Sequence, residues 1–211
     1  MRIAPPRATA ALIAATVVSW IAQSFGLLGV HVVPAAGFIP ARVSGLALDW
    51  AAPLWITPLT ATMLHGGLLH VGLNMLMLGF TGRAVEAVLG TRQFLLLYVI
   101  SAYAAAAGQF IASPGDIAPM IGASGAVSGV LAAYVMMYGT TPVAHANPKV
   151  GRLLAVIWVV AAWIGIQLLT GIAFSGGGTG IAIAAHIGGF LAGVALTPLM
   201  LRLRWRQRGL S

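Results

Sequence analysis

Long apolar runs separated by short polar stretches dominate the pattern of hydrophobic and polar positions along the chain. A transmembrane helix needs about 20 mostly apolar residues. Windows of roughly that length lie at residues 8–30, 66–85, 93–112, 119–139, 152–172 and 180–201. No segment alternates with a period of two, and an open sheet could not satisfy its backbone in lipid. The pattern predicts an all-α, polytopic membrane protein with six transmembrane helices.

The composition agrees with a membrane protein. Of the 211 residues, 60% are hydrophobic and 7% are charged, whereas a soluble domain carries about 25% charged residues. The absence of cysteine excludes a disulfide scaffold, and the low polarity excludes a disordered chain. The first apolar run is longer than the roughly 7–15 residues of a signal-peptide core, so we expect a retained helix. We expect one membrane domain over residues 1–211, with tails at about residues 1–7 and 202–211.

The positive charges fall on one side of the membrane when the six predicted helices are connected in order. That side carries ten of the eleven basic residues, namely Arg2, Arg7, Arg83, Arg92, Lys149, Arg152, Arg202, Arg204, Arg206 and Arg208. The other side carries Arg42, Asp49 and Asp116. Because cytoplasmic segments are enriched in Lys and Arg, both termini are predicted to be cytoplasmic. We read the basic C-terminal tail as an anchor on anionic lipid of the bilayer and expect no nucleic-acid partner.

The predicted connection between the first two helices, residues 31–64, is long and carries few charges. It contains four prolines and the tryptophans Trp50 and Trp55. Tryptophan is enriched where a membrane meets water. We therefore expect this loop to lie on the outer leaflet or partly within it.

Four polar residues lie inside the predicted spans, where polar groups are costly and often functional. Helix positions convert to depth at 1.5 Å per residue, counted from the outer end of each helix. His70 lies roughly 6 Å deep and Asn74 roughly 12 Å, while Ser124 and His186 lie roughly 8 and 9 Å below the starts of their helices. Three separate helices thus bring polar groups to one level in the outer half of the bilayer, with His65 just before the second helix.

The same residues do not suggest a metal site. His65 and His70 are five residues apart, which separates them by about 140° around a helix. There is no cysteine, and the three acidic residues are not spaced with the histidines as metal ligands are. We expect neither a metal nor a cofactor.

Ser124 and His186 each lie next to glycines spaced four residues apart. Gly125 and Gly129 follow Ser124, and Gly189 and Gly193 follow His186. Small residues at this spacing let membrane helices approach closely. Helix packing alone would account for either glycine pair, and a single membrane histidine can be a buried hydrogen-bonding group. If the two glycine faces meet, however, Ser124 lies beside His186.

Three motifs together resemble the rhomboid intramembrane serine proteases. They are His65-Gly-Gly-Leu-Leu-His70-Val-Gly-Leu-Asn74, Gly122-Ala-Ser124-Gly125 and Ala185-His186-Ile-Gly-Gly189-x-x-x-Gly193. They occur in the family's order on the second, fourth and sixth helices, and the resemblance extends over about residues 55–197. It implies a six-transmembrane-helix, rhomboid-like bundle.

The resemblance also implies roles for these residues. Ser124 would be the nucleophile and His186 the general base of a catalytic dyad. His70, Asn74 and the Ser124 backbone N–H would form the oxyanion hole, and His65 would support the site. The implied activity is hydrolysis of transmembrane segments of other membrane proteins near the outer face, in a protein of the bacterial inner membrane. A glycine-rich stretch at residues 175–180 is either a candidate lid or a plain flexible connector.

Two positions depart from the family pattern. The family often has Trp-Arg in the first loop, whereas Trp55 is followed here by Ile56. The family commonly has an aromatic residue four positions after the nucleophile, where this chain has Ser128. Another contact must then orient His186, and a hydrogen bond to Ser128 is one candidate. Glu86 matches a family acid, for which we expect a structural role with Arg83 or backbone groups.

Two other functions compete with proteolysis. A rhomboid-like protein of little or no activity could bind transmembrane segments without cutting them, although such proteins usually lack the serine or the histidine. A small transporter or proton channel could use His70 and His186 as relay groups. Transporters, however, usually show inverted repeats and intramembrane acids, and the sequence shows neither.

Overall fold

The computed structural model describes residues 6–139 and 183–207, with isolated positions between residues 147 and 161. Over these residues the chain is helical and contains no β-strand. The long helices are α1 (Arg7–Ser24), α5 (Leu68–Met77), α6 (Arg83–Leu89), α7 (Thr91–Ala112), α8 (Ser124–Tyr138) and α10 (Ile183–Gln207). The expected helix at 152–172 and the candidate lid at 175–180 lie outside the described residues, apart from a few single positions of the helix.

Among the described residues, three helical stretches are long and apolar enough to cross a membrane. They are Leu68–Leu89, Thr91–Ala112 and Ile183–Arg206, and the shorter helix α8 is also apolar. The first stretch joins α5 to α6 through η3 (Leu78–Gly82), a π-helical segment. The expectation of an all-helical membrane protein is confirmed, while the count of six spans stays a prediction.

At the two ends of the chain, helix boundaries differ from the predicted windows. The first helix ends at Ser24 instead of residue 30, because Gly26 and Gly29 both have positive φ angles. The last helix runs to Gln207 instead of ending near residue 201, so Arg202, Arg204 and Arg206 lie within it. Cations near a helix C-terminus are stabilised by the helix dipole.

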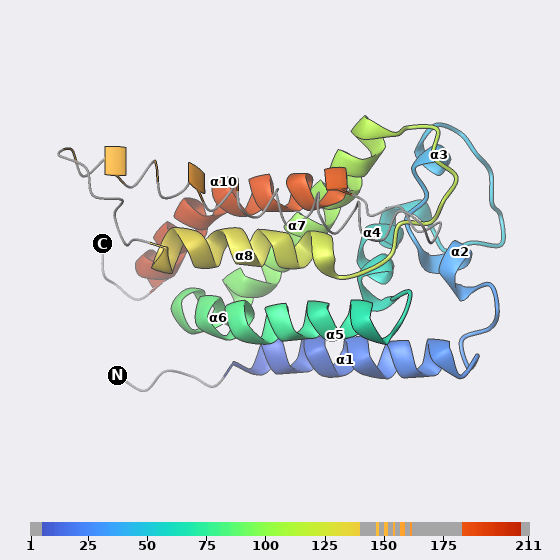
Figure 1. Cartoon of the computed structure of the whole chain (residues 1–211), viewed down its shortest axis with the longest axis horizontal. Helices are drawn as coiled ribbons and strands as arrows, with labels where there is room; N and C mark the ends of the chain where they lie inside the picture. Colours follow the sequence, from blue (N-terminus) through green and yellow to red (C-terminus); the bar gives the residue numbers. More distant parts are fainter. Residues whose placement is uncertain are drawn as a thin grey trace.

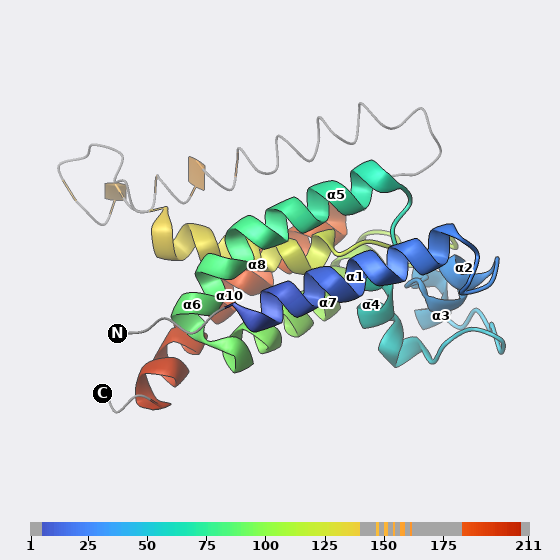
Figure 2. The same cartoon turned by 90° about the horizontal axis from the view of Figure 1, so that it is seen from below.

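The long helices run roughly side by side, with α1 next to α5 and α8 next to α10, as both views show (Figure 1, Figure 2). The start of α1, the α6–α7 junction and the end of α10 lie at one end of this bundle. Five short helical segments occupy the opposite end: α2 (Val32–Ala36), α3 (Pro40–Val43), η1 (Leu54–Ile56), α4 (Thr57–Thr60) and η2 (Ala61–Met63).

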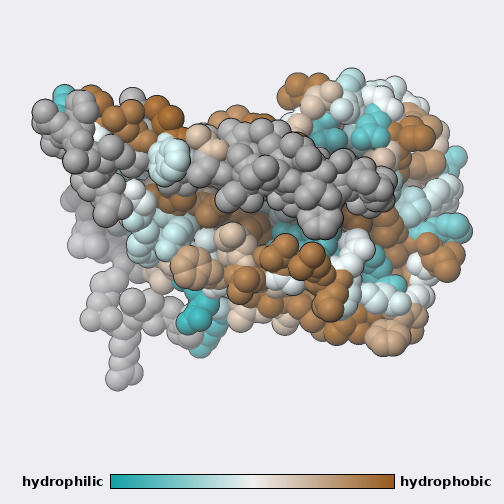
Figure 3. Space-filling model, viewed as in Figure 1, coloured by the Kyte–Doolittle hydropathy of each residue, from teal (hydrophilic) through white to brown (hydrophobic). Residues whose placement is uncertain are grey.

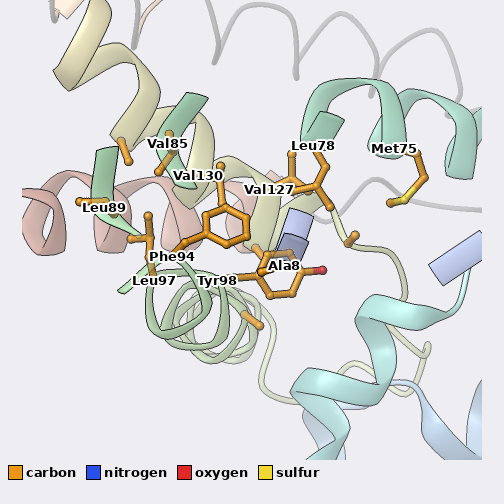
Figure 4. Packing of buried hydrophobic residues seen from close by; sticks show 14 of the residues in the cluster. Ala8, Met75, Leu78, Val85, Leu89, Phe94, Leu97, Tyr98, Val127 and Val130 are labelled. Atoms are coloured by element: carbon orange, nitrogen blue, oxygen red, sulfur yellow. The ribbon is translucent and has the colours of Figure 1, made fainter. Parts of the chain in front are cut away.

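The main hydrophobic core lies where α5, α6, α7 and α8 meet. Phe94 and Leu97 of α7 contribute large buried side chains, and Val127 and Val130 of α8 pack against them (Figure 4). Outside this core, hydrophobic residues also cover much of the surface around α5 (Figure 3), where Leu68, Leu69, Leu73, Leu76 and Phe80 are exposed. An apolar exterior around a packed interior is the arrangement expected in lipid.

Glycines bring the backbones of α8 and α10 into direct contact. A Cβ atom on Gly189 would overlap the carbonyl oxygen of Gly125, and one on Gly193 would overlap the carbonyl oxygen of Gly129. The expected meeting of the two glycine faces is therefore confirmed. Close backbone approach increases dispersion contacts, which drive helix association where lipid removes the hydrophobic effect.

Glu86 connects α1 to the rest of the bundle at the end where α1 begins. Its carboxylate accepts hydrogen bonds from the backbone N–H groups of Ala8 (3.0 Å) and Thr9 (2.8 Å) and from the hydroxyls of Thr9 (2.7 Å) and Thr91 (2.9 Å). The N–H groups of the first helical turn have no partner within their own helix. The expected structural role of Glu86 is confirmed, with backbone N–H groups and two threonine hydroxyls as its partners.

The glycine contact gives a test of the packing. In Gly189→Ala, the added methyl group would push α8 away from α10, and we expect a clear loss of thermal stability, since overpacking costs about 1–3 kcal/mol. Gly72→Ala is the matched control, because nothing lies within 4 Å of its Cβ position and alanine favours the helix. Thermal unfolding in detergent compares the two variants. Equal stability of both would contradict the close contact.

Candidate active site

Ser124 is the first residue of α8, and the segment that leads to it is fixed by the preceding loop. Met120 and Phe38 exchange two backbone hydrogen bonds of 3.0 and 2.8 Å, and the N–H of Gly122 donates to the carbonyl of Ala61 (2.9 Å). The N–H of the next residue, Ala123, donates to Nε2 of His65 (3.3 Å). Three hydrogen-bonded positions thus determine where α8 starts.

The prediction that this helix begins near residue 119 is wrong, as is the estimate that Ser124 lies roughly 8 Å below its start. The backbone N–H groups of Met120, Gly122 and Ala123 bond to the loop instead of to a helical turn. Gly122 also has φ +113°, a conformation that side chains with a Cβ rarely adopt. A Cβ there would additionally lie 2.7 Å from the ring of His70.

Ser124 and His186 are in hydrogen-bonding contact. Oγ of Ser124 on α8 lies 2.6 Å from Nε2 of His186 on α10. His186 is 7% exposed, so the contact is largely shielded from solvent. The glycine contacts described above begin one residue after Ser124 and three residues after His186, and they set the distance between the two helices.

His70 lies against the same site from α5. The ring edge formed by Cε1 and Nε2 faces Gly122, two residues before Ser124. Nδ1 accepts the backbone N–H of Gly66 (3.3 Å). In a neutral imidazole only one nitrogen carries hydrogen, so Nε2 is then the donor. This arrangement provides a hydrogen-bond donor near the serine.

Asn74 is buried one helical turn further along α5. Its side-chain Nδ2 donates to the backbone carbonyl of His70 (2.9 Å). The amide therefore bonds within its own helix. To act on a substrate, it would have to share or turn away from this partner.

His65 is 1% exposed and connects two parts of the site. Besides accepting the Ala123 N–H, its ring lies edge-on to the ring of His70 with centroids 4.8 Å apart. Burial, together with the neighbouring His70, lowers the pKa of His65 to about 4. The ring is therefore neutral near pH 7, as an acceptor nitrogen requires.

Ser128 bonds to the serine backbone. Its hydroxyl donates to the carbonyl of Ser124 (2.7 Å) and not to His186, so the hydrogen bond considered for orienting the histidine is not formed. Ser128 contacts the site through the first turn of α8.

Sequence reasoning missed two residues that hold this region. Gln23 of α1 bonds to the backbone of His65, although in sequence it is only a polar residue near the end of an apolar run. Arg42 donates from Nη2 to the carbonyl of Ala52 (3.0 Å) and so links two parts of the loop between α1 and α5. This is the loop in which Ile56 stands where the family often has arginine. In the described part of the chain, no three His or acidic side chains group together as a metal site would require.

Comparison with protein families assigns the fold. A model of the Rhomboid domain matches residues 53–203. The chain belongs to the rhomboid family. No curated protein matches the sequence. The rhomboid match contains all six candidate site residues and begins after α1.

The lowered pKa of His65 predicts a pH-dependent stability. The folded rhomboid keeps this ring neutral down to about pH 4, whereas the unfolded chain binds the proton near pH 6.5. Stability should therefore fall as the pH drops from about 6.5 to about 4. His65→Gln does not titrate and keeps an oxygen for the Ala123 N–H, so it should lose less stability over this range. Thermal unfolding at several pH values measures the difference, and parallel curves would contradict it.

Proposed function

We propose that this rhomboid is an intramembrane serine endopeptidase that cleaves transmembrane segments of other membrane proteins near the outer membrane face. The observation that supports this function best is the 2.6 Å contact between Ser124 Oγ and His186 Nε2. A serine hydroxyl becomes a useful nucleophile only when a base accepts its proton, and a histidine within hydrogen-bonding distance can do so.

The reaction follows from this pair. His186 takes the proton of Ser124 as Oγ forms a bond to the scissile carbonyl carbon. The carbon–nitrogen bond then breaks, and His186 gives the proton to the leaving amine. Water attacks the resulting ester with His186 again as the base, which releases the new carboxyl end and restores Ser124.

A dyad fits the distribution of acidic residues. The chain has three, and the carboxylate of Glu86 is bound to α1 and α7. Asp49 and Asp116 lie in the loops at the outer end. Packing between α8 and α10 then takes the orienting role that an acid has in a triad.

Negative charge that develops on the carbonyl oxygen needs donors. Ser124 begins α8, so its backbone N–H has no partner within the helix, and the positive end of the helix dipole lies there. His70 offers Nε2–H, and Asn74 contributes if its amide shares or leaves its bond to the His70 carbonyl. One such donor is typically worth about 2.7–4 kcal/mol of barrier.

The substrate must expose its backbone to Ser124. A transmembrane helix hides its carbonyl groups in intrahelical hydrogen bonds, so the substrate has to unwind locally. Segments with glycine or other weak helix formers near the outer interface should be preferred.

We also propose six spans with both termini in the cytoplasm of a bacterium. Six arginines of the described chain gather at the end of the bundle that contains the start of α1 and the end of α10: Arg7, Arg83, Arg92, Arg202, Arg204 and Arg206. Arg42, Asp49 and Asp116 lie toward the other end. The positive-inside rule then orients the molecule.

Removing either member of the dyad should abolish cleavage. We expect Ser124→Ala and His186→Ala to lower kcat/KM on a reporter transmembrane substrate in liposomes by at least about a thousandfold. Ser24→Ala, at an exposed serine whose hydroxyl bonds to Trp20 of its own helix, should retain activity. Cleavage by Ser124→Ala at the wild-type rate would exclude this nucleophile. A folded wild type that neither cleaves nor reacts with a serine-directed phosphonate would favour the inactive, segment-binding alternative.

The orientation can be tested with single cysteines, since the chain has none of its own. In spheroplasts, a membrane-impermeant maleimide should label Asp49→Cys at once but Arg206→Cys only after lysis. Both positions are exposed, so access to the reagent depends on the side of the membrane. The reverse labelling pattern would contradict the proposed topology.

A further inference from the structure

Gln23, near the end of α1, holds the backbone of His65 with both ends of its side-chain amide. Nε2 donates to the carbonyl of His65 (2.8 Å), and Oε1 accepts the N–H of the same residue (3.2 Å). These two hydrogen bonds run in opposite directions, so they fix both the position and the rotation of the peptide groups on either side of His65.

His65, which Gln23 holds in this way, contacts both the segment before Ser124 and His70. The ring of His65 binds the N–H of Ala123, immediately before Ser124, and lies against the ring of His70. At 1% exposure it has little room to move independently of its backbone. A shift of the His65 backbone would therefore move the start of α8 relative to His70.

We propose that Gln23 is a positioning residue for the active site, acting through His65 on the placement of Ser124; this inference rests on the proteolytic function proposed above. α1 then does more than complete the bundle. It lies outside the residues of the rhomboid match, yet it fixes the histidine on which the approach to Ser124 depends.

Thr9 provides a matched control at the opposite end of the same helix, roughly 21 Å along its axis. Its backbone N–H and hydroxyl both bond to Glu86, so it also ties α1 to the bundle. None of its hydrogen bonds reaches the site. Loss of the Thr9 hydroxyl therefore reports on attachment of α1 alone.

The experiment compares Gln23→Met with Thr9→Val, two variants that keep side-chain size and remove hydrogen bonds. Both should lower the melting temperature in detergent. Only Gln23→Met should lower kcat on the reporter substrate, by roughly ten- to a hundredfold, as expected for a small misplacement of reacting groups. KM should stay within about twofold, because substrate binding along the helices is unchanged. Activity losses that track the melting temperatures of both variants would overturn the proposal.

Hydrogen–deuterium exchange provides a readout that does not need activity. Exchange of the segment 116–124 should rise in Gln23→Met and stay at the wild-type level in Thr9→Val. Unchanged exchange in Gln23→Met would refute the positioning role even in an active enzyme. Raised exchange in a protein that proves inactive would leave the coupling of Gln23 to this segment intact and count only against the proteolytic function.

Discussion

The contact between the backbones of α8 and α10 is the constraint on which the rest of the site depends. Lipid removes the hydrophobic drive that brings helices together in water, so close packing of small residues has to replace it. Gly125 and Gly189 meet with no space for a side chain, and this fixes the helix spacing within a narrow range. Ser124 and His186 lie just before this contact, and their 2.6 Å separation follows from it.

Irregular backbone at the end of the bundle that holds the short helical segments follows a second rule: each polar group needs a partner where water is scarce. The segment before Ser124 meets this rule by bonding to Phe38, Ala61 and His65 of the long loop. A movement of the loop would therefore also move the serine, although His65 and Ser124 are 59 positions apart in the sequence. The same rule explains why Glu86 is tolerated in an apolar stretch, since the N–H groups at the start of α1 surround its carboxylate.

Much of the membrane architecture could be predicted from the sequence, because apolar run length and glycine spacing are local signals. The polar residues of the site stood out for the same reason: His70, Ser124 and His186 interrupt apolar runs. The start of α8 could not be predicted, since it depends on hydrogen bonds to a distant loop. Gln23 could not be recognised either, because its partner lies 42 residues away and a glutamine near a helix end resembles an ordinary interfacial residue.

The π-helical segment Leu78–Gly82 has a consequence for the faces of the helix that contains it. Asn74 and Glu86 are twelve residues apart, which in a regular α-helix would leave them about 120° out of phase. A π-turn absorbs one additional residue without breaking the helix, which reduces the angular offset to about 20°. Both side chains can therefore be buried, Asn74 beside His70 and Glu86 against α1. The π-turn thus brings side chains at the two ends of this helical stretch onto the same face.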